Sequence, residues 1–518
     1  MRHWTNSILV IPISLIILGL SSCTRNEEVT QWAPPPYKKQ PATAQMVQSP
    51  TVPEIIPPTP FQLPPTRDPN APIQVPTPDL PHGIPTPPTI PENYTVQPGD
   101  TIGIIARKFA LRPESIIQEN NLANPNYLDV GQVLKFPSNS ARGVGPSFKI
   151  IPDSELIYGP FTMTFDPASF ILARGGYLAK YVEEVDGQSQ TGAQIVERVA
   201  KDYSVNPKLL LALLDFQSGW VSNPSPKSST FTYPLGFADG WHTGLYRQLA
   251  WAANMLNGGY YGWQVNAISN WTLSEGTVIT PDSTINAGTA GVQNFFAQVD
   301  GLDAWQNDVG LNGLFATYFN LFGYPFDYTL DPITPAGLTQ PAMSLPFNTG
   351  ETWNFTGGPH GGWDTGSAWA AVDFAPPGEG AGCSPSDYWV TAVADGPIVR
   401  ASNGAVVQDL DGDRYEETGW TVLYMHIESR DRVAPGTFLK KGDRIGHPSC
   451  EGGIAYATHT HLARRYNGMW IAADGSIPFN FDGYISSGTG KEYDGYLSRG
   501  SQQIEAWDGY NSVNQISH

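Results

Sequence analysis

Five of the nine histidines in this 518-residue chain lie between residues 360 and 461. Two of them, His459 and His461, are two positions apart, so on a β-strand both side chains would point to the same side. His426 lies at the end of 420–427, a run of β-branched and aromatic residues that predicts another strand. Imidazoles that converge in this way can bind a metal ion or transfer protons near neutral pH.

A carboxylate lies within an apolar segment of the same region. Asp373 is flanked by alanine, valine and phenylalanine in 371–375, a sequence that predicts a buried strand. Burying a carboxylate is costly unless a cation compensates its charge. Two imidazoles, one carboxylate and an open fourth position form the usual arrangement of hydrolytic zinc. The alternative is that these residues are ordinary core or surface residues.

The segment 345–485 resembles the lysostaphin-type zinc metallopeptidases, and more closely their β-lytic, staphylolysin-like branch. In the wider family a shorter stretch separates the first histidine from the aspartate. The twelve residues between His360 and Asp373 match the spacing of the β-lytic branch. The resemblance rests on the sequences 357–363, 371–374, 423–426, 440–446 and 459–461.

The resemblance implies that His360, Asp373 and His461 bind one zinc ion, and that His426 and His459 act in the reaction without binding it. Zinc would activate a water molecule and polarise the scissile carbonyl, while the two free histidines would move a proton or hydrogen-bond the oxyanion. The implied reaction is hydrolysis of amide bonds in peptidoglycan stem peptides or cross-bridges. Some relatives keep the fold without catalysis, so a non-catalytic wall-binding or hydrolase-regulating protein is the alternative.

The remainder of the chain must place this domain at its substrate. The length predicts several domains, and the 47 prolines and 53 glycines indicate linkers and turn-rich regions. With 29 basic and 48 acidic residues, the net charge of −19 argues against a nucleic-acid partner. The oligomeric state is not readable from these features.

Residues 1–23 predict a lipoprotein signal peptide. The apolar run 8–20 is too short for a comfortable membrane span, and the sequence Leu-Ser-Ser-Cys at 20–23 resembles a bacterial lipobox. The resemblance implies lipidation of Cys23 and a membrane anchor that faces outward in the bacterial envelope. An ordinary secretory signal is the alternative. Residues 24–92 are rich in proline, threonine and glutamine, which predicts a disordered spacer.

Residues 93–138 predict a small β-α-α-β module, with a capped helix from Ile102 and a second helix that opens at Pro113. This order and its sequence resemble a LysM module, which implies binding to N-acetylglucosamine-containing glycans such as peptidoglycan. A LysM fold that binds nothing is the alternative. By position, the glycan-binding residues would be Gly99, Asp100, Thr101, Asn124 and Tyr127.

Residues 145–340 predict a mainly α-helical domain, in which Asn206 caps a helix that begins at Pro207. The sequence 205–220 resembles the first helix of lysozyme-like transglycosylases. Gln217 stands where that family has its catalytic glutamate, and an amide has no proton to donate at neutral pH. We therefore expect an inactive lysozyme-like domain whose aromatic residues either bind glycan or form its core.

Besides Cys23, the only cysteines are Cys383 and Cys450. Export to an oxidising compartment predicts a disulfide between them, worth about 4 kcal/mol in the chain-entropy model.

Three alternating acidic residues, Asp409, Asp411 and Asp413, resemble the start of a calcium loop, although Trp420 stands where such a loop has its glutamate. A solvated acidic hairpin is the alternative. Residues 486–518 are expected to form a C-terminal tail. The fold class is therefore multidomain, with a LysM module, a helical lysozyme-like domain and an antiparallel β-rich metallopeptidase domain.

Overall fold

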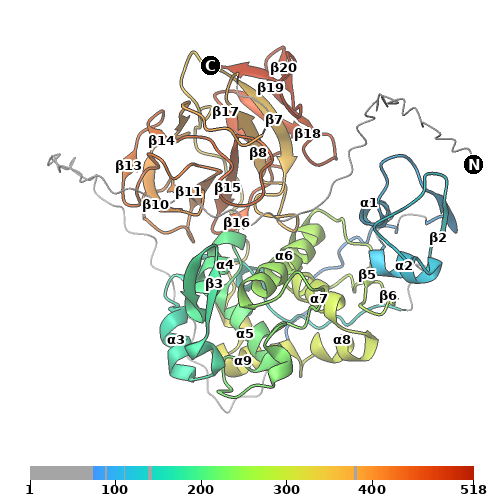
Figure 1. Cartoon of the computed structure of the whole chain (residues 1–518). Coiled ribbons are helices and arrows are strands. Elements are labelled where there is room, and N and C mark those ends of the chain that lie inside the picture. The colour runs from blue at the N-terminus through green and yellow to red at the C-terminus, as the bar shows by residue number, and fades with distance from the viewer. Residues whose placement is uncertain (1–73, 88–89, 110, 138–142, 379–381) are drawn as a thin grey trace, which may run out of the picture. The chain divides into compact units, whose positions relative to one another are not determined.

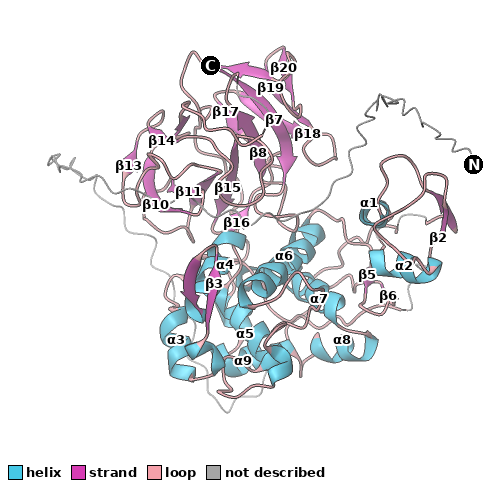
Figure 2. Ribbon diagram, viewed as in Figure 1, coloured by secondary structure: helices cyan, strands magenta, loops and turns pink. Residues whose placement is uncertain are grey.

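The computed structural model describes residues 74–87, 90–109, 111–137, 143–378 and 382–518. The predicted signal peptide, the lipidation site Cys23 and the spacer up to residue 73 lie outside the described residues. Among the described residues, no helix is both long enough and apolar enough to span a membrane. The helices are concentrated in the middle of the chain, and the strands in its C-terminal part (Figure 1, Figure 2).

The LysM module has the predicted β-α-α-β order. It consists of β1 (Asn93–Thr95), α1 (Ile102–Lys108), α2 (Pro113–Asn120) and β2 (Val133–Lys135). The two strands pair antiparallel, with Tyr94 opposite Leu134. Apolar residues of the two helices and of the two strand segments form the core of the module: Val96, Ile102, Ile105, Ala106, Ile116, Leu134 and Phe136.

The helical domain has seven α-helices within the described residues 143–334. They are α3 (Pro167–Arg174), α4 (Gly192–Tyr203), α5 (Pro207–Ser218), α6 (Leu245–Gln264), α7 (Ala287–Val299), α8 (Leu302–Asp308) and α9 (Leu314–Phe322). The Asn206 side chain accepts from the Lys208 N–H and caps α5, as predicted. Two short hairpins complete the domain: β3 (Val182–Val185) with β4 (Gln188–Thr191), and β5 (Trp271–Thr272) with β6 (Val278–Ile279). Its 3-10 helices are η1 (Asp153–Glu155), η2 (Pro160–Thr162), η3 (Tyr177–Lys180), η4 (Ser228–Thr230) and η5 (Pro325–Tyr328).

Residues 79–84, which belong to the predicted spacer, lie against the helical domain. The backbone N–H of Asp79 donates to the Thr284 carbonyl at 2.9 Å, and that of His82 donates to the Ser283 carbonyl at 2.6 Å. The His82 ring stacks on Trp263, with ring centroids 4.6 Å apart. The composition predicted a disordered spacer up to residue 92 and did not predict this contact.

After the LysM module, the chain contacts the helical domain again next to Ser283 and Thr284. The Thr280 N–H donates to the Gly143 carbonyl at 3.0 Å, and the Gly145 N–H donates to the Thr280 carbonyl at 2.8 Å. Both ends of the segment that contains the LysM module are therefore fixed on residues 280–284.

The peptidase region contains a nine-stranded antiparallel sheet. Eight strands follow the order β13-β10-β11-β12-β15-β8-β7-β21, and β16 pairs with β15. Their bounds are β7 (Thr352–His360), β8 (Ala371–Ala375), β10 (Gly396–Ser402), β11 (Ala405–Asp409), β12 (Trp420–Met425), β13 (Phe438–Leu439), β15 (Thr460–Tyr466), β16 (Met469–Trp470) and β21 (Gln515–Ser517).

Two smaller sheets accompany the nine-stranded sheet. β9 (Val390–Thr391) pairs with β14 (Arg444–Gly446), and a four-stranded sheet contains β17 (Asn480–Phe481), β18 (Tyr484–Gly488), β19 (Gly495–Arg499) and β20 (Gln502–Glu505). The expected tail, 486–518, is therefore folded, and its last strand pairs with β7. The prediction stopped too early because the family motifs end before these short strands begin.

Both faces of the nine-stranded sheet are buried. The core cluster that contains the helices also takes these residues from one face of the sheet: Ala371, Ala405, Val407, Leu423, Met425 and Ala463. A second cluster, within the peptidase region, takes these residues from the other face: Val372, Phe374, Val406, Val422, Tyr424 and Leu462. Because side chains alternate along a strand, the helical domain covers the part of one sheet face that β8, β11, β12 and β15 provide.

Candidate metal centre

Three of the predicted site residues meet at neighbouring strands of the nine-stranded sheet. His360 is the last residue of β7, Asp373 lies in β8, and His461 lies in β15. His461 stands directly opposite Asp373 in the β15–β8 pair. The β7–β8 pair places His360 opposite Ala371, two residues before Asp373 and on the same face.

The three potential ligand atoms form a compact triangle. Asp373 Oδ1 lies 3.3 Å from His360 Nε2 and 3.3 Å from His461 Nδ1. The two nitrogens are 2.9 Å apart. A tetrahedral zinc ion with bonds of about 2.1 Å separates its ligand atoms by roughly 3.4 Å. Zinc therefore fits between these atoms after small adjustments.

The other nitrogen of each imidazole is held by a backbone carbonyl. His360 Nδ1 lies 2.8 Å from the Gly358 carbonyl, and His461 Nε2 lies 3.1 Å from the Gly362 carbonyl. A carbonyl only accepts, so these nitrogens carry the protons and those that face Asp373 are free to bind a metal. Asp373 Oδ1 is buried and has no hydrogen-bond partner. This donor set fits a cation.

The electrostatics of the triangle favour an ionised carboxylate. Burial raises the pKa of Asp373, but the neighbouring His360 and His459 outweigh burial and hold this pKa well below its usual range. Burial lowers the pKa of His360, but the Asp373 carboxylate outweighs it, so the pKa of His360 is raised. Burial also lowers the pKa of His461. The Asp373 carboxylate therefore favours a positive charge beside it, either a proton on His360 or a cation.

His426 and His459 lie beside the triangle, but at strand ends. His426 follows β12 in a left-handed conformation with φ 64°, and His459 precedes β15 and forms a single bridge with Ser449. Both residues were predicted inside strands. Their ring centroids are 4.6 Å apart, and His459 Nε2 lies 3.8 Å from Asp373 Oδ2.

Carbonyl groups also orient these two histidines. His426 Nδ1 lies 3.2 Å from the Glu451 carbonyl, and His459 Nδ1 lies 2.8 Å from the Ala457 carbonyl. The Nε2 atom of each ring is therefore the one that can accept a proton. Burial, followed by the neighbouring His459 and His461, lowers the pKa of His426 to about 3. His426 is thus neutral at physiological pH.

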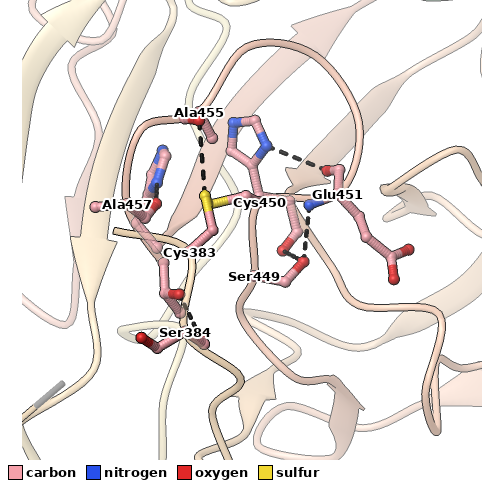
Figure 3. The surroundings of a disulfide bond; sticks show 10 residues. Cys383, Ser384, Ser449, Cys450, Glu451, Ala455 and Ala457 are labelled. Carbon is pink, nitrogen blue, oxygen red and sulfur yellow. Dashed lines mark hydrogen bonds between the residues drawn. A yellow bond between two sulfur atoms is a disulfide. The ribbon is translucent and has the colours of Figure 1, made fainter. Parts of the chain in front are cut away.

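A disulfide joins Cys383 and Cys450 (Figure 3), and the two neighbours of Cys450, Ser449 and Glu451, are both hydrogen-bonded to His426. Cys383 also contacts the loop 451–458, because its Sγ lies 3.8 Å from the Ala455 carbonyl. In the same loop, the Thr458 hydroxyl donates to the Ser384 carbonyl at 2.5 Å. The disulfide therefore fastens the segment that leads into His459.

One aromatic residue at the centre was missed in the sequence. Tyr493 stacks on the His360 ring, with centroids 4.3 Å apart and an angle of 20° between the planes. Its backbone N–H donates to the Pro359 carbonyl at 3.1 Å, and its carbonyl accepts from the Gly358 N–H at 2.7 Å. Tyr493 lies in the region expected to be a tail, and no motif or spacing in the sequence indicates its role.

The five glycan-binding candidates differ in their surroundings. The Asp100 carboxylate accepts hydrogen bonds from the Tyr94 hydroxyl and the Gln97 N–H at 2.8 and 2.7 Å, so it stabilises its own turn. Thr101 caps α1. The remaining candidates have these features: a positive φ of 86° at Gly99, an Asx-type turn at Asn124 and a 67 % exposed side chain at Tyr127.

The structure also brings Asp409, Asp411 and Asp413 together, with potential ligand oxygens within 4.8 Å of one another. Both oxygens of Asp409 accept backbone N–H groups from its own loop. Burial, followed by the neighbouring Asp409, raises the pKa of Asp411 to about 8. The loop is thus held together by its own hydrogen bonds, and calcium binding stays a prediction.

Comparisons with known proteins match both the helical domain and the LysM module. A family model described as "LasA, N-terminal domain" matches residues 149–334, and a LysM model matches residues 94–137. Protease LasA of Pseudomonas aeruginosa is 24% identical over 344 residues, which cover 62% of this chain and 75% of that protein. This chain is similar to Protease LasA. The family model that matches the helical domain describes the N-terminal domain of LasA. The interpretation of this domain as lysozyme-like stays a prediction.

Among solved structures, the M23 metalloprotease pseudoalterin from the deep sea is 23% identical. The match covers 35% of this chain and 100% of that chain, with a TM-score of 0.28. The catalytic domain of lysostaphin from Staphylococcus simulans is also 23% identical, with coverages of 24% and 89% and a TM-score of 0.17.

Proposed function

We propose that this protein is a zinc endopeptidase that hydrolyses amide bonds in peptidoglycan stem peptides or cross-bridges. The observation that carries the proposal is the triangle of His360 Nε2, Asp373 Oδ1 and His461 Nδ1, with a buried carboxylate oxygen that lacks a partner. The relatives named Protease LasA support the endopeptidase activity, and the LysM domain supports a cell-wall substrate.

In this proposal one set of residues binds the metal ion and a second set transfers protons. His360, Asp373 and His461 hold the metal, and zinc bound there supplies Lewis acidity that activates water and polarises the scissile carbonyl. His426 and His459 present their Nε2 atoms beside this position, because Nδ1 of each ring faces a carbonyl, and they can accept a proton and return it to the leaving amine. His426 begins as a neutral acceptor, because burial keeps it uncharged.

The other parts of the chain keep the enzyme at its substrate. The LysM module binds N-acetylglucosamine-containing glycan through its loops, where Tyr127 is exposed. A lipid on Cys23 anchors the protein to the membrane, facing outward, and the spacer after it reaches the wall; secretion without an anchor is the alternative. Such tethering raises the local substrate concentration without new contacts at the site.

The test uses the chain without residues 1–23, as wild type, His461→Ala and His447→Ala. His447 is a matched control, since it is also a buried histidine of the peptidase region but bonds to the Tyr388 carbonyl at 2.8 Å, away from the triangle. Zinc content and release of amino groups from purified peptidoglycan are measured. We expect one zinc and amine release in the wild type and in His447→Ala, and loss of both in His461→Ala.

Two other outcomes would change the assignment. A wild type that binds zinc but releases no amine from any cross-bridge type would favour the non-catalytic wall-binding or regulatory function. A wild type that binds no zinc would contradict the proposed metal centre.

A further inference from the structure

The loop 489–494 connects β18 to β19 and lies against the end of β7 that carries a proposed metal ligand. Both β18 and β19 contact β7 (Figure 1). A Cβ atom added to Gly358 of β7 would lie 2.6 Å from the Asp494 carbonyl carbon. One added to Gly495, directly after the loop, would lie 2.7 Å from Pro359 Cδ. The two glycines therefore allow the loop to pack closely on this strand.

Tyr493, in this loop, has a left-handed backbone conformation with φ 67°. Such a conformation is strained for an aromatic residue, and strain of this kind is concentrated at functional sites. Two backbone hydrogen bonds to β7 hold it: the Tyr493 N–H donates to the Pro359 carbonyl at 3.1 Å, and the Gly358 N–H donates to the Tyr493 carbonyl at 2.7 Å. The Tyr493 ring is thereby fixed on the ring of His360.

Glu492, the residue before Tyr493, is a half-buried carboxylate. Among the residues that the structure describes, this carboxylate has no hydrogen-bond or ion-pair partner. The nearby Lys491 pairs instead with Asp494 at 2.9 Å. Partial burial weakens the hydration of a carboxylate and strengthens its attraction for a cation. The position therefore suits a cation that comes from outside the chain.

The charge of Glu492 acts beside the metal position. Burial, followed by the Asp373 carboxylate, raises the pKa of Tyr493 to about 12. Glu492 and Tyr456 add to this rise. Both side chains are therefore within electrostatic range of the Tyr493 ring, which is 52% exposed.

Tyr456 comes from the second loop at the centre, 451–458. It is 75% exposed, and Ile454 in the same loop is 82% exposed. This loop leads into His459, whose Nε2 atom lies 3.8 Å from Asp373 Oδ2. A peptide at the metal position would therefore meet the loop 451–458 as well as the loop 489–494.

Two tyrosine rings and an unpaired carboxylate together favour an ammonium group. The carboxylate supplies the opposite charge, and the face of an aromatic ring attracts a cation. A neutral or acidic side chain of the substrate would gain neither attraction. A peptide can carry an ammonium group on a basic side chain or at a free N-terminus.

From this arrangement we propose that Glu492 is a specificity-determining residue of the peptidase, which binds an ammonium group of the substrate close to the scissile bond, with Tyr493 and Tyr456 beside it. The inference rests on the zinc endopeptidase proposed above. It names peptides with a free amino group, on a side chain or at an N-terminus, as the preferred substrates. All of the residues involved belong to the peptidase region.

The test uses the zinc-loaded protein without residues 1–23, in the form that is most active on peptidoglycan. Three synthetic peptides share one sequence, which spans the cleaved bond and has a lysine beside it. One peptide has only the side-chain amine free, one has only the N-terminal amine free, and one has both acetylated. We expect kcat/KM to be about fivefold higher for one of the free amines than for the acetylated peptide. That peptide identifies the source of the ammonium group.

Glu492→Gln keeps the size of the side chain and removes its charge. We expect the preference for the free amine to fall to about one, through a higher KM, with unchanged zinc content. Glu351→Gln is the matched control, since Glu351 is also half-buried but lies before β7, at the end away from His360. It accepts hydrogen bonds from Asn348 and Trp353 at 2.8 and 2.9 Å. This control should keep the wild-type preference.

Binding is measured separately with His459→Ala, which retains the three metal ligands. The same peptides, labelled at the C-terminus, are titrated by fluorescence anisotropy, and the preference for the free amine should again be lost when Glu492→Gln is added. Equal cleavage and binding of all three peptides by the wild type, or an equal loss on all three in Glu492→Gln, would overturn the inference. Preferential binding of the free amine without hydrolysis of any peptide would support the recognition and contradict the zinc endopeptidase.

Discussion

At the scale of single residues, His360 must give up a proton when the metal binds. The Asp373 carboxylate, 3.3 Å away, raises the pKa of His360 despite burial, so the proton competes with zinc at a higher pH than at an ordinary histidine. The ionised Asp373 carboxylate therefore favours a positive charge next to it, which either zinc or a proton on His360 can supply.

This gives a prediction for the pH dependence of zinc binding. Protonation of His360 stabilises the metal-free state below its raised pKa, so the apparent affinity for zinc should fall as the pH drops through that raised pKa. Calorimetry in buffers of different ionisation enthalpy should show proton release on binding. An affinity that does not change with pH would contradict the charge balance between His360 and Asp373.

The family resemblance predicted which residues gather at the centre, because its motifs include His360, Asp373 and His461, which the structure brings together. It did not predict Tyr493, whose contact with His360 depends on long-range backbone hydrogen bonds of Tyr493 to Gly358 and Pro359 of β7. Tyrosines occur in many structural contexts, so a single tyrosine in a segment without motifs did not indicate a role at the metal centre.

At the scale of elements, the strand 371–375 was predicted with the bounds that the structure shows, and α5 begins at its predicted cap. The strands at His426 and His459 were predicted too long. The positive φ of His426 turns the chain out of β12, and nothing in a histidine side chain reveals such a backbone conformation beforehand.

The disulfide at the 451–458 loop gives a prediction at this scale. Replacing Cys383 and Cys450 together by serine opens a loop with a sequence separation of 67 residues, which should cost about 4 kcal/mol of stability in the chain-entropy model. The loop before His459 should also become more mobile, so kcat should fall more than zinc content. Urea unfolding and steady-state kinetics measure the two effects.

The matched comparison is the wild type kept oxidised or treated with a reductant. If the serine variant unfolds at the same urea concentration as the oxidised wild type, the disulfide does not stabilise this loop.

At the scale of the whole molecule, the order of the three folded parts followed from composition, caps and motifs. Their packing did not, because an alternating apolar strand such as 420–425 looks the same whether its second face meets helices or another sheet. The small residues Ala371 and Ala463, which leave space for the helical domain, are equally common in any core.

The LysM module gives the last prediction. Replacing residues 90–142 by a short glycine-serine linker should weaken binding to insoluble peptidoglycan tenfold or more, since the second attachment to the polymer is lost. Hydrolysis of a small soluble peptide should keep its kcat and KM, because the metal centre is unchanged. Pull-down with purified wall and peptide kinetics measure the two effects. Unaltered wall binding would show that the module does not bind glycan.

The two attachments at residues 280–284 also decide how mechanical load passes through the protein. A pull from the N-terminal side reaches the helical domain through Asp79 and His82 before it reaches the LysM module. Tension on a bound glycan enters the same loop from both ends of the module. Both attachments are to the helical domain, so a load on either segment would enter the helices before it enters the strands that carry the metal centre.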